Sequence, residues 1–145
     1  MARRRRRLSR FAEPAHTAKL YIGRDKPNGG YVTDAELRRI SDGTAGGIGG
    51  GATTADTRGT WNEPKKPILR ERTATIELVG SAQDSCDKFR QRTRALAARA
   101  AGIAKQTAVL AVTTCATGEV DADLVNARGQ TECPLTRLPG TKRRR

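Results

Sequence analysis

The residues with the clearest chemical potential are arginines gathered at the two ends of the sequence. They are Arg3, Arg4, Arg5, Arg6, Arg7 and Arg10 at the start, with Lys142, Arg143, Arg144 and Arg145 at the end. Runs of like charge repel one another and stay solvated until a polyanion neutralises them. Guanidinium groups hold phosphate oxygens in a bidentate manner without reading base edges. We therefore expect both ends to bind the phosphate backbone of DNA or RNA without sequence preference.

The positive charge of the chain is concentrated in these two arms. The formal net charge is +13, from 28 basic and 15 acidic residues. Without the ten basic residues of the arms, 18 basic residues stand against the same 15 acidic ones. The segment between the arms is therefore nearly neutral, and we expect it to fold independently of the electrostatic attraction that the arms provide.

Cysteine and histidine offer little metal or nucleophile chemistry. Cys86, Cys115 and Cys133 are widely spaced without a C-x-x-C pair, and His16 is the one histidine. A structural zinc site is not favoured. A disulfide between two cysteines stays open, but thiols in a reducing compartment are the favoured interpretation. His16 lies near Pro14 and is expected to be exposed to solvent, so we predict no catalytic residue, metal or cofactor.

A glycine-rich segment, 43–51, has six glycines in nine residues. Glycine raises the entropic cost of regular structure, so the segment is predicted to be a flexible turn. It is not a phosphate-binding P-loop, because that motif needs a Lys and a hydroxyl residue after its last glycine, and Ala52 follows Gly51.

The periodicity of the chain predicts four strands and two helices. In 18–23, Leu20 and Ile22 share one face, and Ala74, Ile76 and Leu78 do the same in 68–79. Capping boxes starting at Thr33 and Ser81 mark two helix beginnings. In chain order the elements are a strand at 18–23, a helix at 34–41, strands at 52–61 and 68–79, a helix from residue 81 and a strand at 107–113.

This order predicts an α+β fold, a ferredoxin-like plait (βαββαβ) in which two helices cover one face of an antiparallel sheet. The domain boundaries follow from it. Residues 1–17 are the Arg-rich N-terminal arm, 18–125 the ferredoxin-like domain, and 126–145 a C-terminal tail that ends in the second basic arm.

Five short motifs resemble an uncharacterised family of small bacterial domains thought to adopt this plait. The motifs are LYIGR (20–24), VTDAE (32–36), the spacing G-x-T-x-x-x-x-x-G-x-W (51–61), RE-x-x-x-x-I (70–76) and the Lys105-Gln106 pair. The resemblance covers residues 19–121. The family has no established reaction, and the resemblance implies one candidate ligand site near Trp61, formed with Arg24, Arg58 and Glu71. The favoured alternative is structural, with Trp61 capping the sheet edge and Arg24 paired with Glu71 on the surface.

These observations favour a non-enzymatic nucleic-acid-binding protein of phage or bacterial type, in which the plait is a scaffold for the arms. The third strand lacks the aromatic residues that RNA-recognition sheets use for base stacking. One alternative is a structural component of a virion or similar assembly, with self-association of the domain. Another is a small-ligand-binding or oxygenase-like plait domain. In a further interpretation the arms are localisation signals.

The sequence also predicts where the protein resides. No apolar run approaches the ~18 residues of a membrane helix. The arginine run is not followed by a hydrophobic segment, so we expect no export signal. The predicted location is cytoplasmic, in association with nucleoid, ribosome or virion.

Overall fold

The computed structural model of the chain describes residues 15–48, 51–61, 65, 67–81 and 83–132. Its eight elements are β1 (His16–Gly23), α2 (Asp34–Ile48), β2 (Gly51–Trp61), β3 (Leu69–Gly80), α3 (Cys86–Ala104), β4 (Val109–Thr114), β5 (Val120–Val125) and β6 (Thr131–Glu132). Regular structure therefore extends beyond 18–125 at both ends. All ten basic residues assigned to nucleic acid binding lie outside the described residues.

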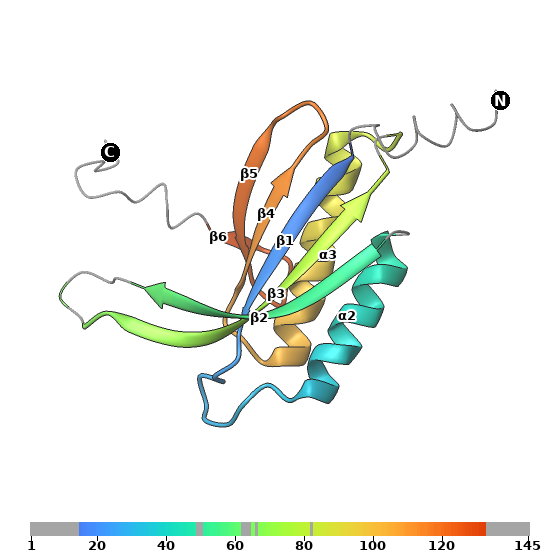
Figure 1. Cartoon of the computed structure of the whole chain (residues 1–145). Helices are drawn as coiled ribbons and strands as arrows, with labels where there is room; N and C mark the ends of the chain where they lie inside the picture. The colour runs from blue at the N-terminus through green and yellow to red at the C-terminus, as the bar shows by residue number, and fades with distance from the viewer. Residues whose placement is uncertain (1–14, 49–50, 62–64, 66, 82, 133–145) are drawn as a thin grey trace.

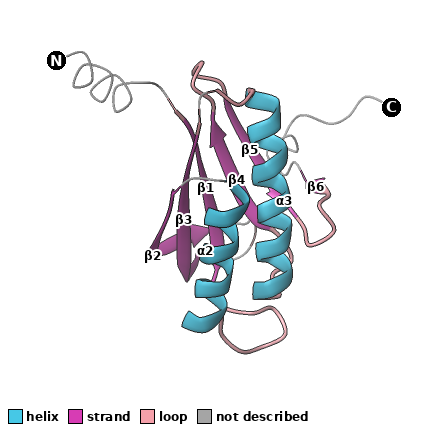
Figure 2. Cartoon of the chain, turned by 90° about the vertical axis from the view of Figure 1, so that its right-hand side faces the viewer, coloured by secondary structure: helices cyan, strands magenta, loops and turns pink. Residues whose placement is uncertain are grey.

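The strands form one antiparallel sheet in the order β2-β3-β1-β4-β5-β6 (Figure 1). Both helices lie on the same face of this sheet (Figure 2). The predicted α+β class is confirmed. The prediction of four strands is too low, because β5 and β6 extend the sheet. The alternation of apolar and polar residues in β5 is weak, Val120 being 63% exposed, and β6 has two residues.

The core lies between the sheet and the helices. The residues that the alternation placed on one face of β1 and β3 are fully buried there: Leu20, Ile22, Ala74, Ile76 and Leu78. Phe89 and four buried alanines of α3 pack against them: Ala97, Ala100, Ala101 and Ala104. Period-two patterning therefore identified the inner face of the sheet correctly.

The first helix begins as its capping box predicts. Thr33 Oγ1 accepts a hydrogen bond from the Glu36 amide, and Glu36 Oε1 accepts one from the Thr33 amide, each at 3.1 Å. Lys26 Nζ also lies 3.1 Å from both carboxylate oxygens of Glu36. The hydrogen bond from the Thr33 backbone, followed by the contact with Lys26, lowers the pKa of Glu36.

The prediction that 43–51 is a flexible turn is wrong over its first part, because α2 continues to Ile48. A Cβ atom on Gly47 would lie 2.7 Å from Leu96 Cδ2, and one on Gly43 would collide with the Arg99 side chain. These glycines therefore allow α3 to approach α2 closely. Tertiary packing outweighs the low helix propensity of glycine.

The second helix begins at Cys86 rather than at Ser81. Ser85 is the N-cap, and its Oγ accepts a hydrogen bond from the Lys88 amide at 3.1 Å. Ser81 instead closes a turn in which its carbonyl accepts a hydrogen bond from Asp84 N at 3.1 Å. Two serines near one helix start both fit the cap pattern, and the sequence motif selected the wrong one.

Cysteine and histidine differ from expectation. Cys86 and Cys115 form a disulfide, so the preference for thiols is wrong for this pair. His16 is 3% exposed rather than solvated. Its Nε2 donates to the Asp84 carbonyl at 2.7 Å, and its Nδ1 accepts from the Ala116 amide at 2.9 Å. A buried histidine with two backbone partners joins the two segments that carry the disulfide.

Within the described part of the chain, neither helix combines the length and the apolar character that crossing a membrane requires.

Candidate functional site

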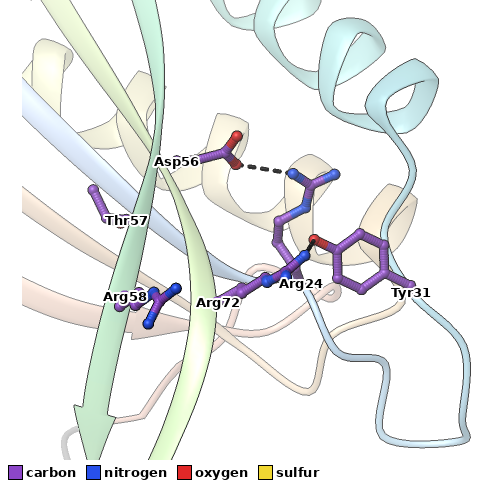
Figure 3. A pocket seen from close by; sticks show the side chains of 6 residues that line it. All are labelled: Arg24, Tyr31, Asp56, Thr57, Arg58 and Arg72. Atoms are coloured by element: carbon purple, nitrogen blue, oxygen red, sulfur yellow. Dashed lines mark hydrogen bonds and ion pairs between the residues drawn. The ribbon is translucent and has the colours of Figure 1, made fainter.

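Three arginines form a row across one end of the sheet. Arg58 of β2 pairs in register with Arg72 of β3, and Arg24, directly after β1, donates its amide to the Arg72 carbonyl at 3.0 Å. Residues directly opposite in an antiparallel pair share a face. Arg72 is two residues from the buried Ala74, so this arginine row, Arg24, Arg58 and Arg72, lies on the helix-covered side of the sheet. Figure 3 shows the three side chains.

Arg24 is the buried member of the row, at 5% exposure. Its Nη1 donates to Asp56 Oδ1 at 2.9 Å, and its Nη2 donates to Asp34 Oδ1 at 2.8 Å and to the Val32 carbonyl at 2.9 Å. Burial alone lowers the pKa of Arg24, but the hydrogen bonds to the two aspartates outweigh that effect and raise it. Arg24 therefore stays charged, and two carboxylates neutralise it.

Tyr31 lies against the row and contacts two of its members. The guanidinium carbon of Arg24 is 4.6 Å from the centre of the tyrosine ring, a cation–π contact. Arg72 Nη1 donates to the Tyr31 hydroxyl at 3.4 Å, and this hydrogen bond raises the pKa of Arg72. The phenol is thereby held at the edge of the arginine row.

An open cavity of about 360 Å³ lies over the row, and we call it the arginine cleft. Its lining consists of Arg24, Tyr31, Asp56, Thr57, Arg58 and Arg72. A second hollow of about 360 Å³ shares Arg58 and Arg72 with the cleft and continues along β2 and β3 to Glu71. Small-molecule sites have volumes of roughly 300–1,000 Å³. The cleft is of the right size for such a ligand.

The electrostatics of the cleft favour an anion. Asp56 and Asp34 are engaged by Arg24. Neither Arg58 nor Arg72 forms an ion pair with any other residue that the structure describes. With respect to the described residues, two adjacent guanidinium groups are therefore available to a carboxylate or phosphate.

The structure brings together part of the site that the family resemblance implied. Arg24 and Arg58 line the cleft, and Glu71 lines the adjoining hollow. Trp61 ends β2, three positions after Arg58, but its side chain lies outside the described residues. The favoured alternative, a surface pair of Arg24 and Glu71, is wrong for Arg24, because this side chain is buried.

Four residues of the cleft were missed from the sequence: Tyr31, Asp56, Thr57 and Arg72. Arg72 and Asp56 could have been found by extending the alternation of β3 and β2 to their ends. Tyr31 follows a turn and reaches the cleft only because Asp25 and Tyr31 form an isolated bridge. No sequence periodicity marks that contact.

The chain belongs to a family described as "Protein of unknown function (DUF3574)", which matches residues 17–119. This match confirms the predicted resemblance to an uncharacterised family. A comparison with curated proteins finds no match.

Two solved structures are similar to the chain, and both are of a phage SAM lyase. The complex with S-methyl-5'-thioadenosine has a TM-score of 0.64 and 18% identity, over 79% of this chain and 92% of the other. The apo structure has a TM-score of 0.58 and 21% identity, over 77% and 88% respectively. At these identities the likeness is one of fold.

The comparisons overturn the predicted function. A non-enzymatic nucleic-acid-binding protein or virion component was expected, with the phosphate backbone as partner, but the similar structures are of an enzyme with a small ligand. The physical reason is the position of the basic residues in the chain. The prediction rested on the terminal arginines, whereas three arginines of the described domain line a cleft of small-molecule size. The small-ligand alternative agrees better with these findings.

Proposed function

We propose that this domain binds a small anionic molecule, with one or two carboxylate or phosphate groups, in the arginine cleft. The observation that carries the proposal is the register of Arg58 with Arg72 on one sheet face, beside an Arg24 that two aspartates already neutralise. The paired strands fix the backbone positions of both arginines, and the Tyr31 hydroxyl contacts the guanidinium group of Arg72. Such pre-organisation reduces the entropic cost of binding.

The similarity to phage SAM lyase supports a small ligand on this fold without assigning the same one. We take β1–β4 with the two helices as a ferredoxin-like unit that β5 and β6 extend, and the order β2-β3-β1-β4 supports this assignment. S-adenosylmethionine carries a sulfonium cation. With its ammonium group and its one carboxylate the molecule has a net positive charge, which Arg58 and Arg72 would repel, so an anionic ligand fits this cleft better.

The test is calorimetric titration of the full chain at constant ionic strength. Citrate, inorganic phosphate and adenosine monophosphate are the anionic probes, and S-methyl-5'-thioadenosine and S-adenosylmethionine are the uncharged and cationic references. The variants Arg58→Gln and Arg72→Gln remove the proposed contacts. Arg39→Gln, an exposed arginine of α2, is the matched control. All variants keep the terminal arginines, so any difference between them reports the cleft.

We expect at least one anionic probe to bind the wild type and the Arg39→Gln control alike. Each cleft variant should lose affinity by about 10-fold or more, since a charge-assisted hydrogen bond contributes about 1.5–3 kcal/mol. Unchanged affinity in both cleft variants would refute the proposed site.

A second candidate function is a small-ligand enzyme. The observation that favours it is the Tyr31 hydroxyl, which lies at the cleft 3.4 Å from Arg72 Nη1 and could exchange a proton with a bound substrate. The test incubates the protein with S-adenosylmethionine and follows S-methyl-5'-thioadenosine by chromatography. Product that is lost in Tyr31→Phe would support the enzyme, and intact substrate with wild-type protein would exclude this reaction.

A further inference from the structure

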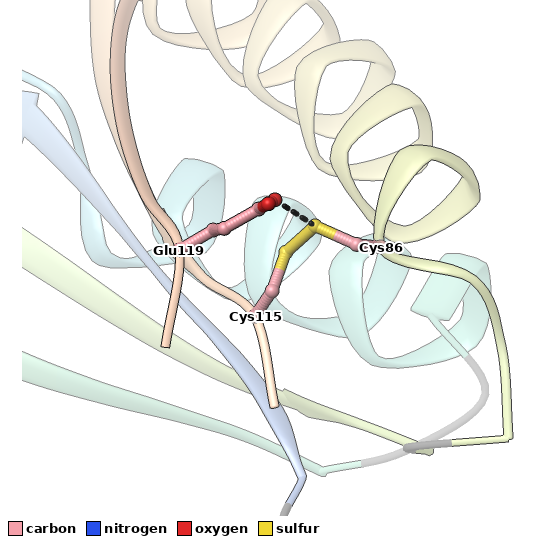
Figure 4. Close-up of side chains that lie close together, drawn as sticks. All are labelled: Cys86, Cys115 and Glu119. Carbon is pink, nitrogen blue, oxygen red and sulfur yellow. Dashed lines mark hydrogen bonds between the residues drawn. A yellow bond between two sulfur atoms is a disulfide. The ribbon is translucent and has the colours of Figure 1, made fainter. Parts of the chain in front are cut away.

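We propose that reduction of the Cys86–Cys115 disulfide opens a zinc-binding site formed by the two cysteine thiolates and Glu119. The site lies on segments separate from the arginine cleft. Cys86 begins α3, Cys115 follows β4, and Glu119 precedes β5. Figure 4 shows the three side chains converging.

The distances match a compact ligand set. The Sγ atoms of both cysteines and a carboxylate oxygen of Glu119 all lie within 4.8 Å of one another. Glu119 Oε2 is 3.7 Å from Cys86 Sγ. Ligands around one zinc ion, with Zn–S of ~2.3 Å and Zn–O of ~2.0–2.2 Å, lie within this limit, and the two sulfur atoms must move apart once their bond is reduced. Small rotamer changes after reduction would bring the three atoms to one centre.

The backbone around the site is held by contacts that do not need the disulfide. Cys115 N donates to the Glu119 carbonyl at 2.8 Å, which fixes the turn between these two ligands. The buried ring of His16 joins the Asp84 carbonyl to the Ala116 amide, at 2.7 and 2.9 Å. One of these partners is two residues before Cys86, and the other directly follows Cys115. The segments should therefore stay adjacent when the sulfur–sulfur bond is broken.

The chemistry of the site changes with its redox state. A dithiol reductant transfers two electrons and two protons to the disulfide, giving two cysteine thiols and the oxidised, cyclic disulfide of the reductant. Each thiol then releases its proton as it binds the metal. Cys86 at the N-terminus of α3 favours the thiolate. Two thiolates beside the Glu119 carboxylate would repel one another, and a divalent cation relieves that repulsion.

Zinc is the metal that this ligand set suits. Thiolates are soft ligands that select zinc over magnesium or calcium, and three protein ligands leave the fourth tetrahedral position to water. Cys115 is 2% exposed, whereas Glu119 lies on the surface. The ion would enter from the carboxylate side.

The experiment uses the full chain with Cys133→Ser, because this third cysteine lies outside the described residues and could bind metal by itself. The protein is reduced with dithiothreitol, which is removed under anaerobic conditions. Co²⁺ is then titrated as a spectroscopic probe, and Zn²⁺ is added to displace it. We expect one Co²⁺ per chain with thiolate-to-cobalt charge-transfer absorption in the reduced protein, and no such absorption in the oxidised protein.

The variants assign the ligands. Cys86→Ser and Cys115→Ser should each diminish the charge-transfer band, and Glu119→Gln should weaken Co²⁺ affinity at least 10-fold. Glu77→Gln, an exposed carboxylate on β3, should leave it unchanged. The reduced Cys133→Ser protein also lacks the disulfide, so its circular dichroism is the reference for the folding of the cysteine variants.

Three outcomes would overturn the proposal. One is a reduced, folded protein without the absorption band. Another is Glu119→Gln with wild-type affinity, which would remove the carboxylate from the site. The third is a reduced protein that is unfolded and that Zn²⁺ does not refold.

Discussion

Replacing Arg24 with methionine should destabilise the domain by about 2–4 kcal/mol. Methionine keeps the volume of the side chain but removes its charge. The carbonyl of buried Val32 loses its guanidinium donor, a cost of about 1–3 kcal/mol. Asp34 and Asp56 are 83% and 77% exposed, so each lost ion pair costs under about 1 kcal/mol. The lost cation–π contact with Tyr31 adds about 0.5–1 kcal/mol.

Urea denaturation followed by circular dichroism measures this effect. With an m-value of about 2 kcal/mol per M, the midpoint should fall by about 1–2 M. Arg39→Met is the matched control, since Arg39 is exposed on α2, and its midpoint should move little. If Arg24→Met moved the midpoint no further than Arg39→Met does, the buried arginine would not be a structural support of the cleft.

Three further perturbations test the fold. Acidification should remove the stability that Glu36 contributes, which is present above its ordinary pKa of 4.5 and lost as the pH falls through the lowered pKa of the folded state; Glu36→Gln should flatten acid denaturation curves in that range. Gly46→Ala adds a methyl group in open space within α2 and should stabilise the domain by up to ~1 kcal/mol. Gly80→Ala adds a Cβ that would strike a core aromatic ring and should destabilise the domain by ~1–3 kcal/mol. The same urea titrations measure both changes. Paired Cys86→Ser and Cys115→Ser substitutions should cost about 3–4 kcal/mol, because the bond closes a loop across a sequence separation of 29, and calorimetric unfolding of oxidised protein against the variant measures it.

The fold could be predicted where local rules and tertiary packing agree. The alternation through Leu20 and Ile76 identified the buried sheet face, and the Thr33 capping box identified the start of α2. Local rules failed where packing decides. The glycines after Asp42 predicted a turn, yet Gly47 lies in a helix. Glycine is needed there because Leu96 of α3 occupies the space that a side chain would need.

The disulfide could not be predicted because cysteine spacing contains no distance information. Cys86 and Cys115 lie 29 residues apart, and the packing of α3 against β4 brings their Cα atoms to 5.6 Å. The same topology buries His16 between two backbone groups. The sequence analysis placed His16 in the N-terminal arm. The strand that contains it begins two residues before the predicted start of the domain at residue 18.

The contrast between terminal and cleft arginines explains why charge counting misled the functional prediction. The ten terminal cations dominate the sum, while each cationic residue of the cleft is one charge among many in a nearly neutral segment. What distinguishes Arg58 and Arg72 is their register across two strands, together with an Arg24 that engages Asp34 and Asp56. The proposed anion binding depends on how many cations share one face without a carboxylate partner among the described residues. Net charge contains neither quantity, so the strand pairing had to be known before the cleft could be identified.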